Sequence, residues 1–414
     1  MTLTNWGGNY RYRAAAVHRP ASLEELQEVV SRAPQVRVTG SRHSFTDIGD
    51  AAELVSLDAL AGGVVLDEDA RTVTVPAGTR YGELAGELHR QGWALANLAS
   101  LPHISVGGAV ATATHGSGAR NGNLATAVAA LALVRSDGER EQLRRGEPGF
   151  EGAVVHLGAL GVLLELTLDI EPDYQVSQYV FEGLGWKTLF EHFDAVLNSA
   201  YSVSVFSRWG QSTDQVWLKV RGGDVAPTQL FGAVPATVDR HPILGLDPVN
   251  CTPQLGLAGP WMERLPHFRL GFTPSAGDEI QSEYHLPREQ AIEGIGAMLG
   301  LAEVLHPLVQ VAEIRAIAAD GLWMSPQYGR DTIAIHFTWV PDQAAVTAAL
   351  HQVEAALLPL GARPHWGKLF LAEAAEIVAG YDRAGDFAAL VRRLDPRGAF
   401  ANPWLERVLL GALS

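Results

Sequence analysis

The alternation of apolar and polar positions predicts helices and short strands in the first part of the chain. The S-x-x-E pattern of Ser22 and Glu25 is typical of a helix start, and Leu23 and Leu26 begin an apolar face behind it. YGELAGELHRQG predicts a second helix that ends at Gly92. QVRV and RTVTVP alternate with a period of two and predict strands. Helices and strands follow one another through about 170 residues, which predicts an α+β fold.

The middle of the chain has more segments of strand type, such as DQVWLKV and TIAIHFTWV. Just before it, HLGALGVLLELTLDI at 156–170 predicts a pair of buried strands that ends at Glu171 and Pro172. A domain boundary is expected there, because the composition changes and 414 residues exceed one ordinary core. The chain contains no internal repeat.

Charge and composition exclude several classes of partner. The formal net charge of −15 repels phosphate backbones and anionic lipids, so we expect neither nucleic acid nor a membrane as partner. No stretch reaches the roughly 18 apolar residues of a membrane helix, and the first residues lack a signal-peptide core. Cys251 is the single cysteine, which excludes an internal disulfide and suits a reducing interior. We therefore expect a cytoplasmic protein.

Several familiar catalytic motifs are absent. The sequence contains neither the G-x-G-x-x-G of a Rossmann turn nor the G-x-x-x-x-G-K-[ST] of a P-loop. It has no H-E-x-x-H and no pair of histidines at helical spacing, so no metal site is predicted. G-x-S-x-G is also missing, which gives no support to a serine hydrolase.

Two stretches of small residues could approach a ligand closely with free backbone amides. In TGSRHSFTDIGD, the amides of Gly40, Ser41, Arg42 and Ser44 could hold a phosphate while His43 faces something reactive; a solvated surface turn is the alternative. NLASLPHISVGGAVATATHGSG is rich in Gly, Ala, Ser and Thr and has no acidic residue. Its alternative is a tightly packed helix or turn.

Polar residues also interrupt otherwise apolar strands. Glu313 and Arg315 in VAEIRAIAAD are two apart, as are His336 and Thr338 in TIAIHFTWV, so each pair points to one face of a strand. Lys368 follows in HWGKLF. Each alone could be a satisfied pair of the core or surface, but together they predict one polar cavity. A carboxylate beside these donors suits a ligand rich in hydroxyl groups, a polyol or sugar.

These motifs resemble those of a known family. TGSRHSF, NLASLPHISVGGAVATATHGSG, EIR, HFTW, HWGK and the C-terminal DPRGAFANPW, in this order, are similar to the bacterial alditol oxidases of the vanillyl-alcohol oxidase superfamily of flavoproteins. The resemblance covers nearly the whole chain. Arg42 departs from the pattern, because some members have glycine there.

The resemblance implies a two-domain fold of the vanillyl-alcohol oxidase type. Residues 1–173, completed by 372–414, would bind FAD, and 174–371 would form a substrate-binding cap. His43 would carry the flavin covalently through a ring nitrogen, and Ala99 matches a small residue that controls the access of dioxygen to the flavin. The residues implied at the cofactor are Val38, Thr39, Gly40, Ser41, Arg42, His43, Ser44, Ala99, Ser100, Ser105, Gly108, Thr112, Ala113, Thr114, His115 and His365. Those implied at the polyol are Ser100, Glu313, Arg315, Thr338 and Lys368, with Glu313, Arg315, His336 and Lys368 in catalytic positions.

The implied reaction is oxidation of the terminal hydroxyl of an alditol, such as xylitol or sorbitol, to the aldose. Dioxygen would then be reduced to hydrogen peroxide. Arg315 and Lys368 would acidify the hydroxyl, and Lys368 would take its proton only if burial among cations lowers its pKa. Alternatives are an aldonolactone oxidase, a polyol dehydrogenase with another acceptor, and a polyol-binding flavoprotein without turnover. A monomer is expected.

Overall fold

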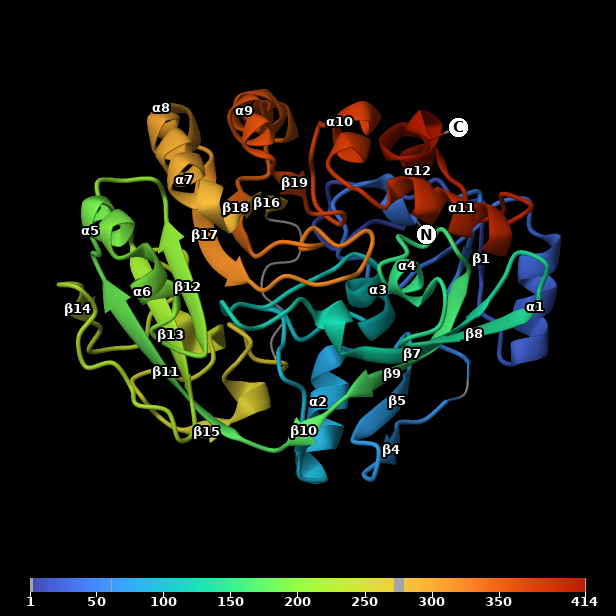
Figure 1. Cartoon of the computed structure of the whole chain (residues 1–414), viewed down its shortest axis with the longest axis horizontal. Coiled ribbons are helices and arrows are strands. Elements are labelled where there is room, and N and C mark those ends of the chain that lie inside the picture. Colours follow the sequence, from blue (N-terminus) through green and yellow to red (C-terminus); the bar gives the residue numbers. More distant parts are fainter. Residues whose placement is uncertain (1–2, 61, 272–278, 414) are drawn as a thin grey trace.

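Two large β-sheets form the two halves of the molecule in the computed structural model, which describes residues 3–60, 62–271 and 279–413 (Figure 1). The five-stranded antiparallel sheet has the order β4 (Val65–Asp67), β5 (Thr72–Pro76), β9 (Val162–Asp169), β7 (Val128–Val134) and β8 (Arg140–Arg144). A small parallel sheet of β1 (Ala16–His18), β3 (Glu53–Val55) and β2 (Val36–Val38) and a pair of β10 (Glu171–Pro172) and β6 (Trp93–Ala94) complete this half.

A nine-stranded sheet forms the other half. Its order is β14 (Val234–Pro235), β11 (Gln175–Glu182), β13 (Gln215–Arg221), β12 (Ser202–Ser207), β17 (Val309–Ile317), β18 (Thr332–Trp339), β16 (Ile280–Pro287) and β19 (Arg363–Pro364), with β15 (Gly259–Pro260) beside β11. The chain passes from the first half to the second between β10 and β11, at residues 172–175.

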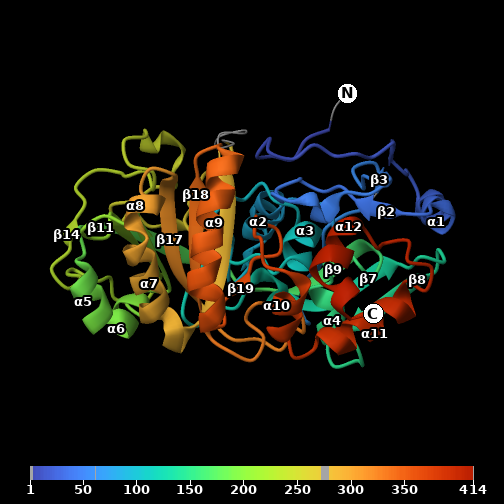
Figure 2. The same ribbon diagram turned by 90° about the horizontal axis from the view of Figure 1, so that it is seen from above.

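Helices cover both sheets. In chain order they are α1 (Leu23–Arg32), α2 (Tyr81–Arg90), α3 (Val106–Ala111), α4 (Phe150–Val154), α5 (Trp186–Glu191), α6 (Phe193–Leu197), α7 (Ala291–Gly300), α8 (Ala302–Leu305), α9 (Gln343–Leu357), α10 (Ala374–Ala379), α11 (Ala384–Leu394) and α12 (Pro403–Val408). The helices from α7 to α9 lie along one face of the nine-stranded sheet (Figure 2). Helices α10 to α12 return to the N-terminal half and share its core, so both ends of the chain lie in the same half (Figure 1).

The two helices predicted near the N-terminus are confirmed. Ser22 Oγ accepts a hydrogen bond from Glu25 N at 3.2 Å, which satisfies one free amide of the first turn of α1. Helix α2 ends at Arg90, and Gly92 follows with a φ of +79°, a conformation that glycine adopts without strain.

The predicted pair of strands at 156–170 is wrong. A single strand, β9, runs from Val162, while residues 156–161 form a turn. Leu157, Gly158 and Gly161 have φ values of 54°, 71° and 155°, which a strand does not accommodate. Leu157, Ala159 and Leu160 of this turn are buried in the core, and Leu157 N donates to Ala111 O at the end of α3. Their apolar side chains therefore resemble those of a buried strand in the sequence.

One face of the nine-stranded sheet is apolar and the other is polar. On β17, Ala312, Ile314 and Ala316 pack into the core with the helices, while Glu313 and Arg315 point to the opposite face. A β-bulge between positions 309 and 311 changes the alternation, so the strand can bury Val309 in this core and still direct position 311 to the polar face.

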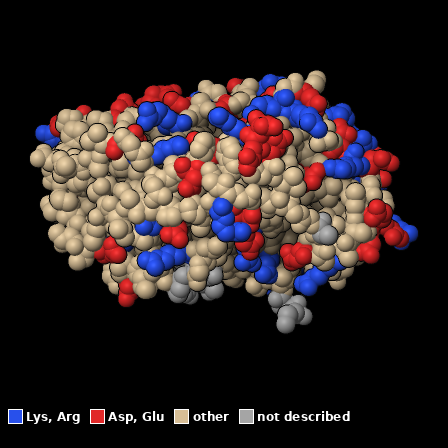
Figure 3. All heavy atoms as spheres, turned by 90° about the horizontal axis from the view of Figure 1, so that it is seen from below, with Lys and Arg blue, Asp and Glu red and all other residues tan. Residues whose placement is uncertain are grey.

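Charges of both signs are interspersed on the surface drawn in Figure 3, and no large basic area forms on that face. Among the described residues, no helix is both long and apolar enough to cross a bilayer.

A buried arginine ties the C-terminal segment to the N-terminal half. Arg37 on β2 is 4% exposed and donates to the carbonyl oxygens of Ile48, Leu157, Gly158 and Phe400 at 2.5–3.0 Å. Burial lowers its pKa to about 10, so the guanidinium still carries its charge at neutral pH.

Arg37→Met should lower the free energy of unfolding by about 3 kcal/mol, because four buried carbonyl groups lose their donor. Urea unfolding at neutral pH measures the loss. Arg32→Met, at a position whose side chain is 77% exposed on α1, is the matched control and should change stability by less than about 0.5 kcal/mol. Equal stability of the Arg37 variant and the wild type would contradict this role.

Candidate active site

A cavity of about 1330 Å³ lies between the polar face of the nine-stranded sheet and the N-terminal half. It is larger than the roughly 300–1,000 Å³ of an ordinary single-ligand pocket. The predicted site residues that line it are Val38, Thr39, Gly40, Ser41, Arg42, His43, Ser44, Ala99, Ser100, Ser105, Gly108, Thr112, Thr114, His115, Glu313, Arg315, His336, Thr338, His365 and Lys368. Ala113 alone of the predicted set does not line the cavity, and its side chain is buried in the N-terminal core.

The loop after β2 approaches the opposite wall very closely. A Cβ atom on Gly40 would lie 2.8 Å from Ser105 Oγ, so no larger residue fits without a shift. Arg42 has a φ of 60°, a conformation that glycine adopts without strain and other residues seldom adopt. Phe45 N donates to Gly367 O at 2.8 Å, so the loop is fixed to the segment that carries Lys368.

His43 presents a free nitrogen at the cavity. Its ring stacks on Trp6 with 5.1 Å between centroids. Nδ1 is buried and has no hydrogen-bond partner among the residues that the structure describes. Burial lowers the pKa of His43 to about 4, so the imidazole is neutral at physiological pH. A neutral imidazole with an unused nitrogen is a nucleophile or a ligand, and the solvated surface turn is excluded.

The stretch from 97 to 118 both packs tightly and lines the cavity, so both interpretations of its small residues apply. It forms a loop and the short helix α3, whose Gly107 packs so closely that a Cβ would lie 2.8 Å from Ala77 Cβ. The same segment lines the cavity through Ser100, Ser105 and Gly108. Small residues are therefore required on two sides at once.

Strand register brings the polar residues of the sheet together. Glu313 on β17 is paired with His336 on β18, and His336 is paired with Glu283 on β16. Neighbouring strands lie about 4.8 Å apart, so these three side chains form a row on the cavity face. His365 N donates to Glu283 O at 2.9 Å, which places Lys368 at the end of this row.

Glu283 binds the cations of this row, and its side chain is completely buried. It accepts hydrogen bonds from Arg315 Nη2 at 2.7 Å and from Lys368 Nζ, and His115 Nε2 lies 3.0 Å from its Oε1. Burial alone would raise the pKa of Glu283, but the charges of Lys368 and Arg315 outweigh burial and hold the pKa well below its usual value. Glu283 is therefore a carboxylate that binds two cations.

Lys368 has a lower pKa than an exposed lysine. Burial lowers the pKa, Glu283 opposes this effect, and Arg315 adds to it. Its Nζ also lies 2.7 Å from His336 Nδ1, and His336 Nε2 contacts Thr338 Oγ1 at 3.1 Å. Burial lowers the pKa of His336 to about 4, so its ring is neutral and relays hydrogen bonds.

Glu313 is oriented by a residue that the sequence did not indicate. His267 Nε2 lies 2.8 Å from Glu313 Oε1, and the second oxygen, Oε2, lies 3.5 Å from Arg315 Nε. The charge of Arg315 and the hydrogen bond of His267 hold the pKa of Glu313 below its usual value, although burial alone would raise it. His267 N and Phe268 N both donate to Ser100 O, which connects this wall to the N-terminal half.

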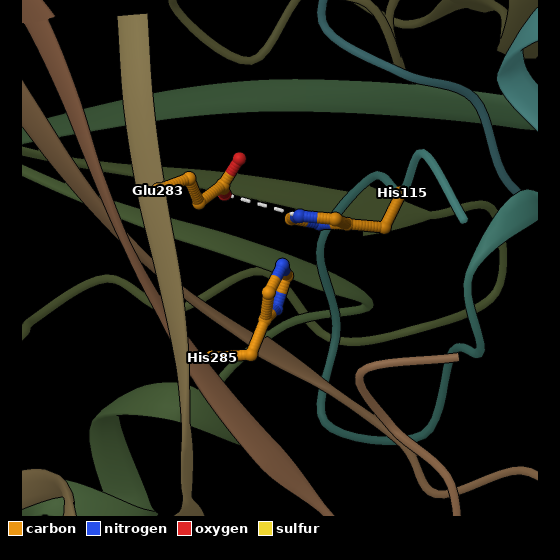
Figure 4. A group of neighbouring side chains, drawn as sticks. All are labelled: His115, Glu283 and His285. Carbon is orange, nitrogen blue, oxygen red and sulfur yellow. Dashed lines mark ion pairs between the residues drawn. The ribbon is translucent and has the colours of Figure 1, made fainter. Parts of the chain in front are cut away.

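His115, Glu283 and His285 place potential metal ligands within 4.8 Å of one another (Figure 4). Hydrogen bonds decide against a metal. The Gln327 amide oxygen accepts from Asn123 Nδ2 at 3.0 Å, so its NH₂ donates to His285 Nδ1 at 2.9 Å. His285 Nε2 must then carry a proton and cannot ligate, and both Glu283 oxygens already bind cations. Two members of the group, His115 and Glu283, line the cavity.

Sequence reasoning missed Glu283, His267 and Lys219. Glu283 had a usable signal, since Glu283 and His285 alternate with Tyr284 and Leu286 as the polar positions of β17 and β18 alternate with apolar residues. His267 lies in a loop and gave no pattern. Lys219 is the single charged residue within VWLKV, yet its contact with His267 joins segments 48 residues apart.

Comparisons with known proteins agree with this arrangement. A family model described as FAD binding domain matches residues 14–144, and one described as D-arabinono-1,4-lactone oxidase matches 278–408. The chain is 48% identical to an alditol oxidase of a Streptomyces species over 99% of both chains. It is 30% identical to L-gulono-1,4-lactone dehydrogenase of Mycobacterium tuberculosis over 98% of both. A crystal structure of cholesterol oxidase from B. sterolicum has the same fold, with a TM-score of 0.80 and 16% identity over 99% of this chain and 96% of that one.

The fold, the cavity and these matches define a two-domain FAD-binding oxidoreductase of the vanillyl-alcohol oxidase superfamily. Within this superfamily, the chain belongs to the alditol oxidase family.

The cavity fits FAD on structural grounds. Its volume can hold a dinucleotide and a second small molecule, and Gly40 and Gly108 leave space where a Cβ would contact Ser105 Oγ at 2.8 and 2.9 Å. The unused Nδ1 of His43 lies in the same wall. The residues of the N-terminal half would hold the cofactor against the row formed by Glu313, His336 and Glu283.

Glu283→Gln should lower the free energy of unfolding at pH 7 by about 3 kcal/mol, because Arg315 and Lys368 lose the carboxylate that compensates their burial. The folded pKa of Glu283 is depressed, so its contribution is complete above the ordinary glutamate value of 4.5 and declines as the pH falls below it.

Urea unfolding at pH 7 and at about pH 4 measures this difference, with Glu191→Gln on α5, where the side chain is 56% exposed, as the control. A difference that is absent at pH 7, or that widens on acidification, contradicts the assignment.

Proposed function

We propose that the protein uses FAD to oxidise the terminal primary hydroxyl of an alditol to the aldose and reduces dioxygen to hydrogen peroxide. The observation that carries this proposal is the row of donors and acceptors on one buried wall, where Glu313, Arg315, Thr338 and Lys368 face the cavity together. A polyol needs both kinds of group for each hydroxyl that leaves water. The 48% identity to an alditol oxidase supports the same substrate class.

An aldonolactone is the second candidate substrate. The relative named for a gulonolactone is 30% identical, and the family model named for an arabinonolactone matches the second half of the chain. The alditol is favoured, because the relative named for it is far more similar over the same length.

The N-terminal half, 1–173 with 372–414, would bind FAD, and 174–371 would bind the substrate. Bound FAD supplies the acceptor for the hydride, and dioxygen restores it. We propose that His43 Nδ1 is bonded to the flavin, since this nitrogen is neutral and unused by the described residues. Ala99 would leave dioxygen room beside the ring system.

Ser100, Glu313, Arg315, Thr338 and Lys368 would fix the hydroxyl groups. Glu313 Oε2 would accept a hydrogen bond from a substrate hydroxyl, because Oε1 already lies at hydrogen-bond distance from His267. Arg315 stabilises negative charge on the reacting oxygen as its proton leaves. These contacts orient the terminal carbon and exclude water from it.

Lys368 Nζ would take the proton of the reacting hydroxyl. At rest Lys368 would bind Glu283 as an ammonium. Burial and Arg315 lower its pKa, so that it can release its proton before the step, and Glu283 would stabilise the ammonium that the step forms again. His336 Nδ1, at 2.7 Å, holds the amine in place. The base and its stabilising carboxylate thus come from neighbouring segments of one wall.

We propose that the protein acts as a monomer, because this chain carries every group that the proposed reaction uses. Its single cysteine, Cys251, is buried and free, which suits a cytoplasmic location.

Purified protein should consume dioxygen and form an equal amount of peroxide with xylitol or sorbitol, and much less with an aldonolactone of similar size. An oxygen electrode with a peroxide assay measures both. Bleaching of the flavin by polyol without dioxygen uptake would indicate a dehydrogenase. No bleaching by any polyol, with the lactone active, would replace the alditol by the second candidate.

His43→Ala should abolish covalent attachment, while the cavity can still bind FAD. Acid-precipitated wild-type protein is expected to remain yellow, and the variant pellet to be colourless with the flavin in the supernatant. Ser44→Ala, in the same loop, is the control and should keep the colour. A colourless wild-type pellet would refute the bond.

A further inference from the structure

The chain contains only three lysines among its 31 lysine and arginine residues. Lys368 lines the cavity, and Lys219 contacts His267, which is itself a lining residue. Lys187 on α5 is 88% exposed, whereas Lys219 is 1% exposed and the side chain of Lys368 is 14% exposed. The other 28 basic residues are arginines. Two of the three lysines are therefore largely buried, where a compact ammonium group differs most from a guanidinium. Of these two, only Lys368 has a part in the proposed reaction.

Lys219 lies in the middle of β13, facing the cavity wall from behind. Its Nζ donates to Leu265 O and lies 3.0 Å from His267 Nδ1. The residues that the structure describes provide no ion pair to this ammonium, so its charge is compensated only through its hydrogen-bond partners. Burying an ammonium group without an ion pair costs folding free energy, which suggests that Lys219 has a functional role.

His267 connects Lys219 to Glu313. Its ring is held by the edges of Phe206 and Trp217, at 5.5 and 5.3 Å between centroids. Burial lowers the pKa of His267 to about 4, so the ring is neutral and has one donor and one acceptor nitrogen. A lysine ammonium can only donate, so Nδ1 must accept and Nε2 must donate to Glu313 Oε1 at 2.8 Å.

We propose that Lys219 is a positioning residue that fixes the tautomer of His267, so that His267 holds Glu313 Oε1 and leaves Oε2 free for a hydroxyl of the substrate. The proposal rests on the proposed alditol site and adds a residue that does not touch the substrate. Without the ammonium, His267 can turn its proton to Nδ1 and present a bare nitrogen to the carboxylate, which would displace Glu313.

The state of Lys219 also depends on pH. Burial lowers its pKa to about 7, Glu313 opposes this effect, and Arg315 adds to it. Facing it are Glu313 and Arg315 from β17, and His267 and Cys251 from the segment 251–267, of which His267 and the thiol are neutral. The affinity for polyol should therefore fall as the pH rises through about 7.

The test measures the dissociation constant of xylitol from dithionite-reduced protein under nitrogen, where no turnover occurs, by calorimetry between pH 6 and pH 8. Lys219→Met and His267→Phe should each weaken binding about tenfold. The double variant should be no weaker than His267→Phe, because Lys219 acts through His267. Lys219→Met should also lose the pH dependence. Lys187→Met is the matched control and should behave as the wild type.

Additive losses in the double variant, or wild-type affinity and pH dependence in Lys219→Met, would overturn the proposal. Circular dichroism and flavin content establish that the variants fold.

A second measurement uses the intact lysine. Protein labelled with [¹⁵N]lysine gives three Nζ signals, and Lys219→Met assigns one of them. Glu313→Gln should lower the pH midpoint of the Lys219 signal, because the carboxylate stabilises its charge. An unchanged pH midpoint of the Lys219 signal in Glu313→Gln would overturn the coupling between Lys219 and Glu313. If wild-type protein neither binds nor oxidises any polyol, the alditol proposal fails, and this titration still decides whether Lys219 is coupled to Glu313.

Discussion

The buried carboxylate of Glu283, bound by two cations, is the interaction on which the cavity wall depends. Burying an isolated carboxylate costs several kcal/mol of free energy, so both Arg315 and Lys368 must lie in contact with Glu283. Arg315 comes from β17 and Lys368 from the segment after β19, on opposite sides of β16 in the sheet order. The register of β16, β17 and β18 is therefore constrained by the need to place these two cations beside Glu283.

The same interaction gives the wall its chemical character. Glu283 balances the charges of Arg315 and Lys368, so that Glu313 would be available to the ligand, and the pKa of Lys368 lies below its usual range. His336 and His267 are neutral at physiological pH and pass hydrogen bonds between charged groups without adding charge. Opposite this wall, small residues of the N-terminal half bring the backbone close to the cavity, where the cofactor would bind. The N-terminal half therefore provides space for the cofactor, and the half with the nine-stranded sheet provides the polar groups.

The sequence predicted local features well because their causes are local. The capping residues of α1, the end of α2 and the period of two that places Glu313 and Arg315 on one face all follow from neighbouring residues. It failed at 156–161, where a buried turn has the apolar composition of a strand. It also missed Glu283, whose importance comes from partners on other segments, and Lys219, which reaches Glu313 only through a loop histidine. Contacts of this kind depend on strand order, which no local pattern contains.

The anaerobic reduction of the bound flavin by xylitol in Lys368→Met tests the central claim that this wall removes the hydroxyl proton. Methionine fills the space of lysine and has no base, so rapid mixing should show a reduction rate at least about 100-fold below that of the wild type, with the flavin content unchanged. A rate equal to that of the wild type would contradict the account.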